Sequence, residues 1–243
     1  MGPLLPMQKI KLTSKHEVAT DTTAFYFEKP PGFTYTAGQF VELTLIDPPE
    51  TDAEGNTRAY SIASPPYEAD LCFTTRMRDT AFKRVLGSLP IGGEVWLDGP
   101  FGNFLMPSNP NTLAVFLIGG IGITPVRSMI LQATHDQKPN QTFIFYSNHT
   151  PADAAFLQEL QDASQKNPFL TFVPTMTNVG DTVPWDGKTG YISEPLLREY
   201  LPKPDLGTYY LCGPETMVSA MHKLLETMGI YNENIHTEEF SGY

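Results

Sequence analysis

In the first hundred residues, apolar and polar positions alternate over short runs that clusters of proline and glycine separate. Such alternation is typical of strands with one buried face, and the proline and glycine clusters are typical of turns. One helical segment interrupts the runs at 80–89, with Phe82, Val85 and Leu86 on one face. Strands are expected at 8–13, 23–28, 40–46, 58–63, 71–76 and 94–98. Six short strands without a long helix predict a small antiparallel β-barrel over residues 1–106.

Beyond a linker rich in proline and asparagine, the pattern changes to alternating strands and helices. Leu113 to Ile118 is a continuous apolar run, as expected of a strand buried on both faces. Residues 215–228 carry an apolar stripe at helical spacing. Further strands are expected at 142–146, 170–175 and 209–212, further helices at 125–134, 152–166 and 194–200, and a surface loop at 178–189. This alternation predicts a doubly wound α/β domain with a parallel sheet over residues 107–243.

Charge and composition exclude several classes of function. The formal net charge is -11, with 27 acidic and 16 basic residues, which argues against nucleic acids and anionic membranes as partners. Two cysteines are too few for an iron–sulfur cluster held by four thiolates. The five histidines lack metal-ligand spacing, so no metal site is expected. The first residues do not resemble a signal peptide and no apolar run could span a bilayer, so a cytoplasmic location is expected.

A glycine-rich turn follows the apolar strand at 113–118. Gly119, Gly120 and Gly122 let the backbone turn tightly and bring its N–H groups close to a pyrophosphate. Thr124 is placed to cap the helix that begins there, and Pro125 suits the first helical turn. The turn therefore indicates a dinucleotide site, although any strand-to-helix turn favours glycine.

A second glycine turn, Cys212-Gly213-Pro214, ends another apolar strand and begins the long helix at 215–228. In open α/β sheets, ligands bind outside the carboxyl ends of the strands, so both turns are expected to face one crevice. Cys212 is either a contact to a ligand ring or a small buried apolar residue.

The barrel half contains a candidate ligand strand, Arg58-Ala59-Tyr60-Ser61. Arginine offers a planar fork to a phosphate, the tyrosine ring offers a stacking surface, and the serine offers a hydroxyl. A strand-exposed arginine and tyrosine are also common without any ligand, so this strand has a purely structural interpretation as well.

A basic cluster at the start of the barrel helix is unusual in so acidic a chain. Arg76, Arg78 and Lys83 surround a helix N-terminus, where an anion is favoured. Residues 99–104 then form an aromatic, glycine-rich turn that either walls a flat ligand or ends the barrel.

Taken in order, these motifs resemble the ferredoxin–NADP reductase superfamily of FAD-binding and NAD(P)-binding oxidoreductases. The matching elements are Arg-x-Tyr-Ser, the helix start, Gly-Pro-Phe-Gly, Gly-Gly-x-Gly-x-x-Pro, Cys-Gly-Pro and a terminal aromatic, and they cover nearly the whole chain. The resemblance implies non-covalent FAD on the barrel and NADH or NADPH on the α/β domain. It also implies single-electron exchange with a carrier such as ferredoxin or flavodoxin.

The resemblance implies catalytic positions at Ser61, Cys212, Glu238 and Phe240. Ser61 would lie near flavin N5 and Cys212 near the nicotinamide, while Phe240, or alternatively Tyr243, would cover the flavin face. Cofactor binding is accordingly expected at Arg58, Ala59, Tyr60, Ser61, Thr74, Thr75, Arg76, Thr80, Ala81, Phe82, Lys83, Gly119, Gly120, Gly122, Thr124, Cys212, Gly213, Pro214 and Phe240.

Two departures from the family pattern qualify this interpretation. Lys83 stands where many relatives have serine, and His149 stands where an arginine is frequent, so NADH is at least as well supported as NADPH. Carrier docking would use either a basic patch formed by Arg76, Arg78, Lys83 and Arg84 or a different partner. Alternative functions are a reductase component of an oxygenase, a free-flavin or ferric reductase, and a nucleotide-binding electron-transfer subunit without turnover.

Overall fold

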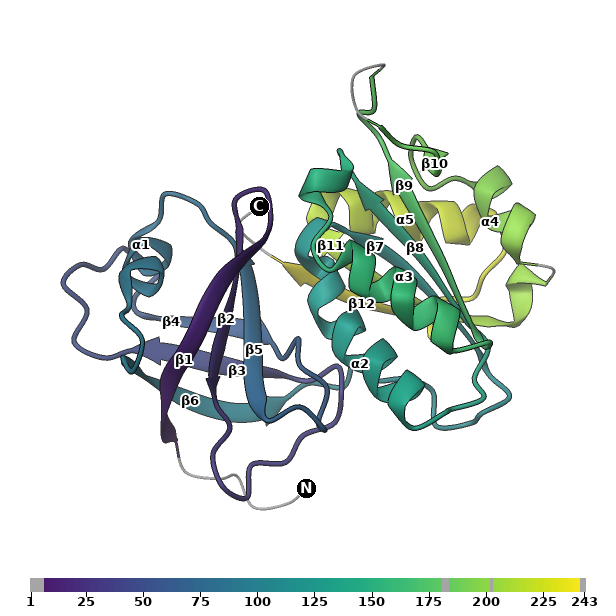
Figure 1. Ribbon diagram of the computed structural model, residues 1–243. Coiled ribbons are helices and arrows are strands. Elements are labelled where there is room, and N and C mark those ends of the chain that lie inside the picture. The colour runs from purple at the N-terminus through teal and green to yellow at the C-terminus, as the bar shows by residue number, and fades with distance from the viewer. Residues whose placement is uncertain (1–6, 181–183, 202, 241–243) are drawn as a thin grey trace.

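The computed structural model describes residues 7–180, 184–201 and 203–240, and the side chains of residues 239 and 240 lie outside this description. Within these residues the chain forms two six-stranded sheets that lie side by side (Figure 1). Strands of the first sheet come from residues 8–101 and strands of the second from residues 113–240.

The first sheet is antiparallel throughout and closes into a barrel. Its strands are β1 (Gln8–Ala19), β2 (Thr22–Glu28), β3 (Phe40–Leu45), β4 (Thr57–Ser61), β5 (Asp70–Arg76) and β6 (Glu94–Phe101), in the order β4-β3-β6-β1-β2-β5. The Ala63 N–H, just beyond β4, donates to the Cys72 carbonyl of β5 over 2.8 Å. This bond joins the two edges of the sheet and confirms the predicted barrel.

Alternation along each strand places an aromatic and aliphatic core inside the barrel. In β1, Ile10 and Leu12 are buried between polar neighbours. Helix α1 (Ala81–Ser88) adds Phe82 and Leu86 to the same cluster. β1 extends beyond the predicted strand at 8–13, because its second half pairs with β2 while its side chains stay largely exposed. A period-two pattern reveals a strand only where one face is buried.

The second sheet is parallel and carries helices on both faces. Its strands are β7 (Leu113–Gly119), β8 (Thr142–Asn148), β9 (Leu170–Met176), β10 (Lys188–Thr189), β11 (Gly207–Pro214) and β12 (Ile235–Phe240), in the order β10-β9-β8-β7-β11-β12. Phe116 and Ile118 of β7 share a core with α2 (Ile123–His135) and α3 (Leu157–Lys166). Val115 and Leu117 face α4 (Glu194–Tyr200) and α5 (Glu215–Thr227). The predicted doubly wound arrangement is therefore confirmed.

Further elements differ from the sequence-based expectation. The helix predicted at 152–166 is wrong in its first part: a 3₁₀ turn, η2 (Pro151–Asp153), comes first and α3 begins only after Phe156, whose φ is 59°. Thr150 and Asp153 cap each other's backbone and hold this separate turn. Strand β12 was not predicted, because its sequence IHTEEF contains no apolar run. The short β10 falls inside the expected surface loop.

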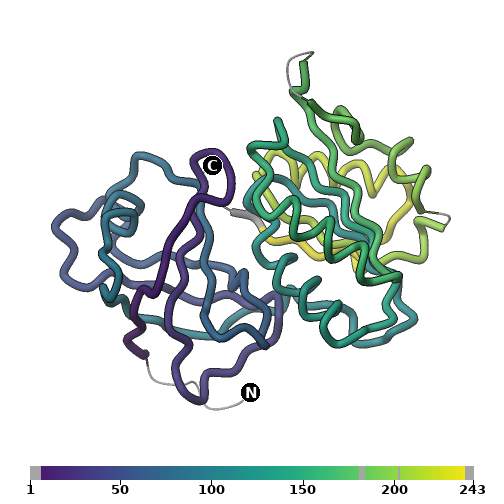
Figure 2. The backbone as a smooth tube through the Cα atoms, viewed as in Figure 1, coloured from purple at the N-terminus to yellow at the C-terminus, as the bar shows by residue number. Residues whose placement is uncertain are grey.

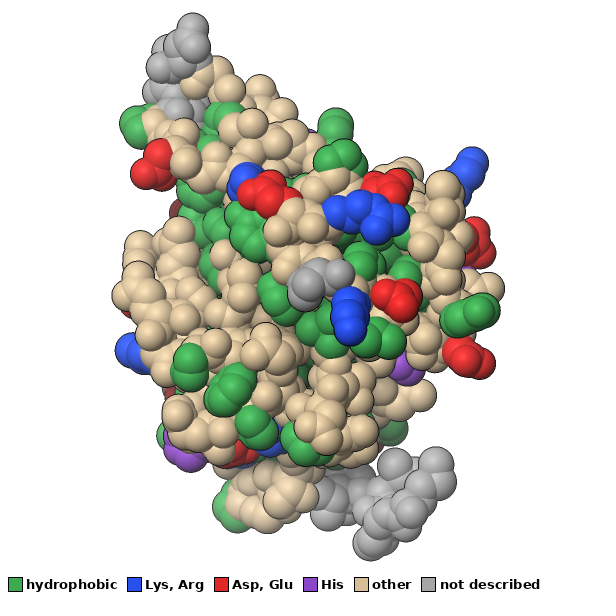
Figure 3. Space-filling view, turned by 90° about the vertical axis from the view of Figure 1, so that its right-hand side faces the viewer, with side chains coloured by type: hydrophobic (Ala, Val, Ile, Leu, Met, Phe, Trp, Pro, Cys, Tyr) green, Lys and Arg blue, Asp and Glu red, His purple; other side chains and the backbone are tan. Residues whose placement is uncertain are grey.

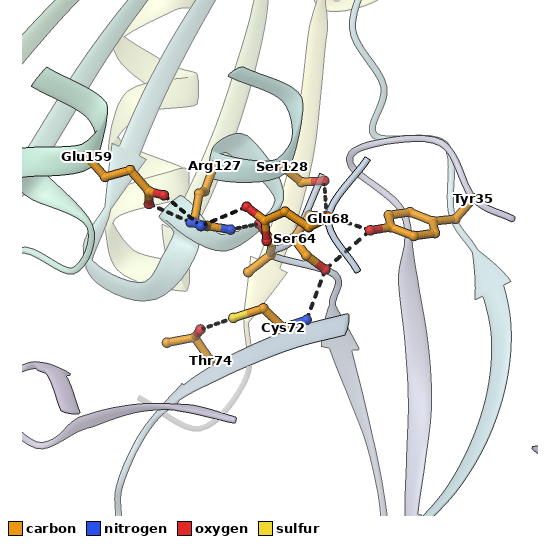
Figure 4. A network of polar contacts seen from close by, with 9 residues as sticks. Tyr35, Ser64, Glu68, Cys72, Thr74, Arg127, Ser128 and Glu159 are labelled. Carbon is orange, nitrogen blue, oxygen red and sulfur yellow. Dashed lines mark hydrogen bonds and ion pairs between the residues drawn. The ribbon is translucent and has the colours of Figure 1, made fainter. Parts of the chain in front are cut away.

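A buried polar network joins the barrel to the second sheet (Figure 4). Arg127 of α2, with 5% of its side chain exposed, donates to Glu159 of α3 over 2.7 Å and pairs with Glu68 of the barrel half over 3.2 Å. Ser128 donates to the Ser64 carbonyl over 2.7 Å. These bonds fix helix α2, and the glycine turn before it, against the barrel.

Strand β12 runs back from the second sheet toward the barrel, as the yellow segment of Figure 2 shows. No helix within the described ranges combines the length and apolar composition that crossing a bilayer requires. In the same part of the chain, no three His, Cys, Asp or Glu side chains are grouped so as to hold a metal ion.

Candidate functional site

Two cavities meet where the barrel faces the carboxyl ends of the parallel strands. The larger, of about 550 Å³, lies over the ends of β7, β8 and β11, and the smaller, of about 220 Å³, lies against β4, β5 and α1. Arg76 of β5 and Ile121 of the 3₁₀ turn η1 (Gly120–Gly122) line both cavities. The two cavities are therefore neighbours with a shared wall.

The two glycine turns pack directly against each other beside the larger cavity. A Cβ atom on Gly122 would lie 2.4 Å from the Cys212 carbonyl oxygen, and one on Gly119 would lie 2.3 Å from the Met217 sulfur. Gly213 has a φ of 151° and sits against the backbone of Gly119. Both turns thus face one crevice, as their positions at the strand ends predict, and Gly119, Gly120 and Pro214 line it.

Thr124 has a different position from the one expected. The N-cap of α2 is Gly122, without a side-chain cap, and the Thr124 hydroxyl instead donates to the Ile121 carbonyl over 3.0 Å. The capping role predicted for Thr124 is therefore wrong. Its side chain lines the smaller cavity rather than the larger one.

Strand β4 brings the Arg-Ala-Tyr-Ser segment to the smaller cavity, where Arg58, Ala59, Tyr60 and Ser61 all line the wall. The Arg58 guanidinium lies 5.1 Å from the centre of the Phe82 ring, within cation–π range. The Tyr60 ring packs tilted against Phe82, with 6.1 Å between centroids. Burial raises the pKa of Tyr60 to about 12, against an opposing hydrogen bond from Thr75, so the phenol stays neutral.

The start of α1 supplies the other wall of the smaller cavity. The Thr80 hydroxyl caps the helix by accepting from the Lys83 N–H over 3.4 Å. Burial lowers the pKa of the half-buried Lys83 ammonium, and the nearby Arg78 and Arg58 charges lower it further. Of the residues expected here, Thr74, Thr75, Arg76, Thr80, Phe82 and Lys83 line the cavity, whereas Ala81 is buried behind it.

Three polar side chains from distant parts of the chain converge at the junction. The Ser61 hydroxyl donates to Glu238 Oε1 over 3.2 Å, across 177 positions of sequence. Glu238 of β12 pairs in register with Cys212 of β11. Burial raises the pKa of Glu238 to about 7, against the opposing Ser61 hydrogen bond, and Glu238 Oε2 has no partner among the described residues. Burial, followed by the Glu238 charge, raises the pKa of the Cys212 thiol well above its ordinary value.

The backbone of Phe240 pairs with Pro214 at the end of β12. The Phe240 side chain and all of Tyr243 lie outside the described residues, so the expected aromatic cover stays a prediction.

Sequence reasoning missed several residues of the site. Asp153 lines the larger cavity and pairs with Arg76 over 3.6 Å. Glu54 lines the smaller cavity and pairs with Arg58 over 3.0 Å. Asp153 lies in the 3₁₀ turn η2 and Glu54 in a loop, and no periodicity marks either acid. Further unexpected residues at the larger cavity are Thr22, Tyr191, Ile192, Thr216, Met217, Ala220 and Met221.

Comparisons with known proteins match this architecture. The family model described as the oxidoreductase NAD-binding domain matches residues 116–223. The chain is 30% identical over 202 residues to one component of the Na(+)-translocating NADH-quinone reductase of Actinobacillus succinogenes, covering 76% of this chain and 49% of that protein. It is 29% identical over 225 residues to the reductase subunit of a glycine betaine monooxygenase from Chromohalobacter salexigens, covering 90% of this chain and 60% of that protein. The chain thus spans about half the length of the first of these relatives.

Solved structures share the fold over almost the whole chain. A cytochrome P450 reductase from Amycolatopsis has a TM-score of 0.81 at 22% identity, covering 97% of this chain and 70% of that one. A ferredoxin NADP+ reductase from Neisseria gonorrhoeae, solved with bound FAD and NADP, has a TM-score of 0.80 at 22% identity, covering 97% of this chain and 99% of that one.

Proposed function

We propose that the chain is a member of the ferredoxin–NADP reductase family of FAD-binding and NAD-binding oxidoreductases, as its match to the oxidoreductase NAD-binding domain and its fold support. In this role it oxidises a reduced nicotinamide dinucleotide through FAD and passes the electrons singly to a carrier protein. In this proposal, residues 1–106 hold the flavin and residues 107–243 hold the dinucleotide. The observation that carries it is the hydrogen bond from Ser61, which lines the smaller cavity, to Glu238, whose strand pairs in register with Cys212 at the turn beside the larger cavity.

The residues of the smaller cavity fit a flavin nucleotide. Arg58 and Lys83 offer positive charge and Thr74, Thr75 and Thr80 offer hydroxyl groups, which suits a phosphate-bearing ligand. Glu238 Oε2, which has no partner within the described part of the chain, offers one more polar contact at the junction. These features support FAD on the barrel.

The larger cavity fits a dinucleotide at the paired glycine turns, because Gly119 and Gly120 line it without side chains of their own. At its edge, the exposed His149 hydrogen-bonds Thr177 with Nδ1 and Oγ1 3.2 Å apart, and Arg76 is already paired with Asp153. A histidine thus stands at the position where an arginine is frequent among members of the family, and on that ground we propose a preference for NADH. Steady-state kinetics with both nucleotides test this, and His149→Arg is expected to raise kcat/KM for NADPH about tenfold while leaving NADH use within about twofold.

When bound, the flavin supplies the chemistry that converts hydride transfer into single-electron release. The chain's own residues orient the rings and manage one proton. The Glu238 carboxyl, with a pKa near 7, holds or releases a proton at neutral pH. The Ser61 hydroxyl donates to that carboxyl, and the Cys212 thiol beside it stays neutral.

Anaerobic mixing of the FAD-loaded protein with NADH tests the proposal. The visible absorbance of the flavin is expected to bleach, and Ser61→Ala is expected to slow the bleaching about tenfold or more without loss of bound FAD. An unbleached flavin in the wild-type protein would leave a nucleotide-binding subunit without turnover as the better account.

The electron acceptor is constrained by the surface. Of the basic residues considered for docking, Arg84 is paired with Glu50 and Asp79, and Arg76 is paired with Asp153. On the face shown in Figure 3, acidic and basic side chains also intermingle rather than forming a patch of one sign. These pairings weaken the case for an acidic ferredoxin and favour a partner recognised without a large basic patch.

An oxygenase component is the second candidate acceptor, because the reductase subunit of glycine betaine monooxygenase matches 90% of this chain. The match to a component of the Na(+)-translocating NADH-quinone reductase supports a third acceptor, a membrane complex. NADH oxidation with ferricyanide, a ferredoxin, a flavodoxin and a quinone separates these acceptors. Ferricyanide reduction alone, with no protein carrier active, would point to a dedicated partner.

A further inference from the structure

Arg58, the cation that the proposed flavin site offers to a pyrophosphate, is held by the loop that precedes its own strand. Its Nη1 atom donates to the carbonyl oxygens of Glu54, Gly55 and Thr57 over 3.0, 3.1 and 2.8 Å. Its Nη2 atom donates to Asp52 Oδ1 over 3.0 Å and pairs with Glu54 Oε2 over 3.0 Å. Carbonyl groups thus hold one nitrogen, and two carboxylates take the other.

Asp52 lies where an anion is favoured. Its carboxylate accepts hydrogen bonds from Arg58 and from the Glu54 N–H over 3.1 Å. The backbone of Ala81, at the start of α1, also helps to lower the pKa of this carboxylate. Although partial burial opposes the effect, these bonds hold the pKa of Asp52 below its ordinary value, so the group is charged at neutral pH. An arginine fork and a helix N-terminus are the two groups expected to hold a pyrophosphate, and Asp52 binds the first and lies beside the second.

A phosphate and these carboxylates compete for the Nη2 side of the Arg58 guanidinium. Like charges at such distances repel, and Asp52 already takes one hydrogen of Nη2 while the Glu54 carboxylate lies 3.0 Å from the same atom. The Glu54 carboxylate is 77% exposed, whereas Asp52 is 32% exposed, so Asp52 forms the better-shielded contact. The carbonyl bonds to Nη1 are compatible with a ligand and keep the guanidinium oriented.

We propose that Asp52, assisted by Glu54, is an internal competitor for the flavin pyrophosphate, which must displace both carboxylates from Arg58 in order to bind. The inference rests on the proposed flavin function. Only those molecules in which Arg58 is released from both carboxylates accept the ligand. The competitor therefore raises the apparent Kd for FAD by the reciprocal of the fraction of such molecules. It leaves the Kd for riboflavin, which has no phosphate, unchanged.

Flavin titrations of the nucleotide-free protein, read as quenching of flavin fluorescence at fixed ionic strength, test the proposal. Asp52→Asn is expected to lower the Kd for FAD about tenfold and Glu54→Gln about twofold, with riboflavin binding unchanged in both. The matched control is Glu50→Gln, which removes the same charge nearby but from a carboxylate that pairs with Arg84. It is expected to leave the Kd for FAD within about 1.5-fold of wild type.

The possible outcomes separate this inference from the proposed function. If wild type binds FAD and both variants bind it equally or more weakly, the acids position Arg58 and the inference is wrong while the function stands. Equal tightening of riboflavin also overturns the inference, because the effect is then not on the phosphates. If no form binds FAD, both proposals fail, and if only the variants bind it, the inference is supported directly. Glu54→Gln decides the matter should Asp52→Asn not fold.

Discussion

Glu238 carries a carboxyl group whose charge changes close to neutral pH, because burial raises its pKa to about 7. A raised pKa means that the folded state binds the proton more tightly than the unfolded state does. This contribution to stability is therefore complete below the ordinary glutamate pKa and is lost as the pH rises through about 7. Between about pH 5 and pH 8, the titration of Glu238 is expected to lower the free energy of unfolding of the wild type by roughly 1–3 kcal/mol. Glu238→Gln stays neutral and is expected to lack this decrease.

Urea unfolding gives the free energy of unfolding of both proteins at these two pH values. Subtracting the change in the variant from the change in the wild type cancels the contributions of other titrating groups. An identical pH dependence in wild type and Glu238→Gln would show that the carboxyl is not coupled to folding.

Gly122 is required by a close approach of backbone rather than by its own conformation. A Cβ atom there would lie 2.4 Å from the Cys212 carbonyl oxygen, so the two turns would have to separate. Gly122→Ala is expected to reduce the free energy of unfolding by roughly 1–3 kcal/mol, as overpacking does elsewhere. Gly180→Ala is the control, because a Cβ atom there meets nothing within 4 Å. Equal unfolding midpoints in urea for the two variants would contradict this explanation.

For single residues, the sequence predicts which side chains line the candidate site better than it predicts which other residues they bind. Arg58, Tyr60 and Ser61 stand out because a cation, a ring and a hydroxyl follow one another in a strand, and all three reach the smaller cavity. The Asp52 contact to Arg58 depends on how a loop folds, so no spacing in the chain reveals it. The wrong capping role for Thr124 has a similar cause, since an added 3₁₀ turn leads directly into α2 and makes Gly122 its N-cap.

Helix α1 is short, and its last turn is stabilised from another element. The Lys15 ammonium of β1 donates to the carbonyl oxygens of Gly87 and Leu89 over 2.6 and 2.8 Å. These carbonyls have no partner within the helix, and a cation also favours the negative end of the helix dipole. Lys15→Met is expected to cost about 1–2 kcal/mol of stability, measured by urea unfolding.

The matched control for that substitution is Lys11→Met, an exposed position on the same strand. It is expected to change stability by less than about 0.5 kcal/mol. A loss of similar size in both variants would assign the effect to the strand surface rather than to the end of α1.

The predictability of each element follows its burial. The run from Leu113 to Ile118 is buried on both faces, and both the strand and its sheet are predicted correctly. Strand β12 pairs with β11 alone and carries His236, Thr237 and Glu238, so its sequence does not look like a strand. The separation of η2 from α3 depends on Phe156 in a left-handed conformation, which few sequence patterns mark.

The relative position of the two sheets depends on Arg127. Besides its pairs with Glu159 and Glu68, the guanidinium donates to the Ala63 carbonyl of the barrel half over 2.8 Å. Arg127→Met is expected to lower the free energy of unfolding by roughly 2–4 kcal/mol, because it leaves partly buried carboxylates without their partner. It is also expected to split thermal unfolding, followed by calorimetry, into two transitions, one for each sheet.

Arg198→Met is the control for Arg127, because it removes an exposed arginine paired with Glu194 within one helix. Its effect is expected to stay within about 0.5 kcal/mol. A single, unshifted transition in Arg127→Met would mean that apolar packing alone joins the sheets.

At the scale of the whole molecule, the order of motifs along the chain indicates both folding units, but the way they meet is not encoded locally. Arg127 is the one arginine of α2, and from the sequence alone it is expected to face solvent, although it is buried in the structure. Only the tertiary structure brings Glu68 and Glu159 to it.

The hydrogen bond between Ser61 and Glu238 has a consequence for biosynthesis. Chains grow from the N-terminus, and early units fold while later residues are still being added. The barrel can therefore be complete before Glu238, the hydrogen-bond acceptor of Ser61 that lies 177 positions later in the sequence, has been synthesised. Every other strand of both sheets has been made before β12 is added beside β11. A ribosome-bound chain is thus expected to gain its barrel early and its finished junction only as synthesis reaches the last strand.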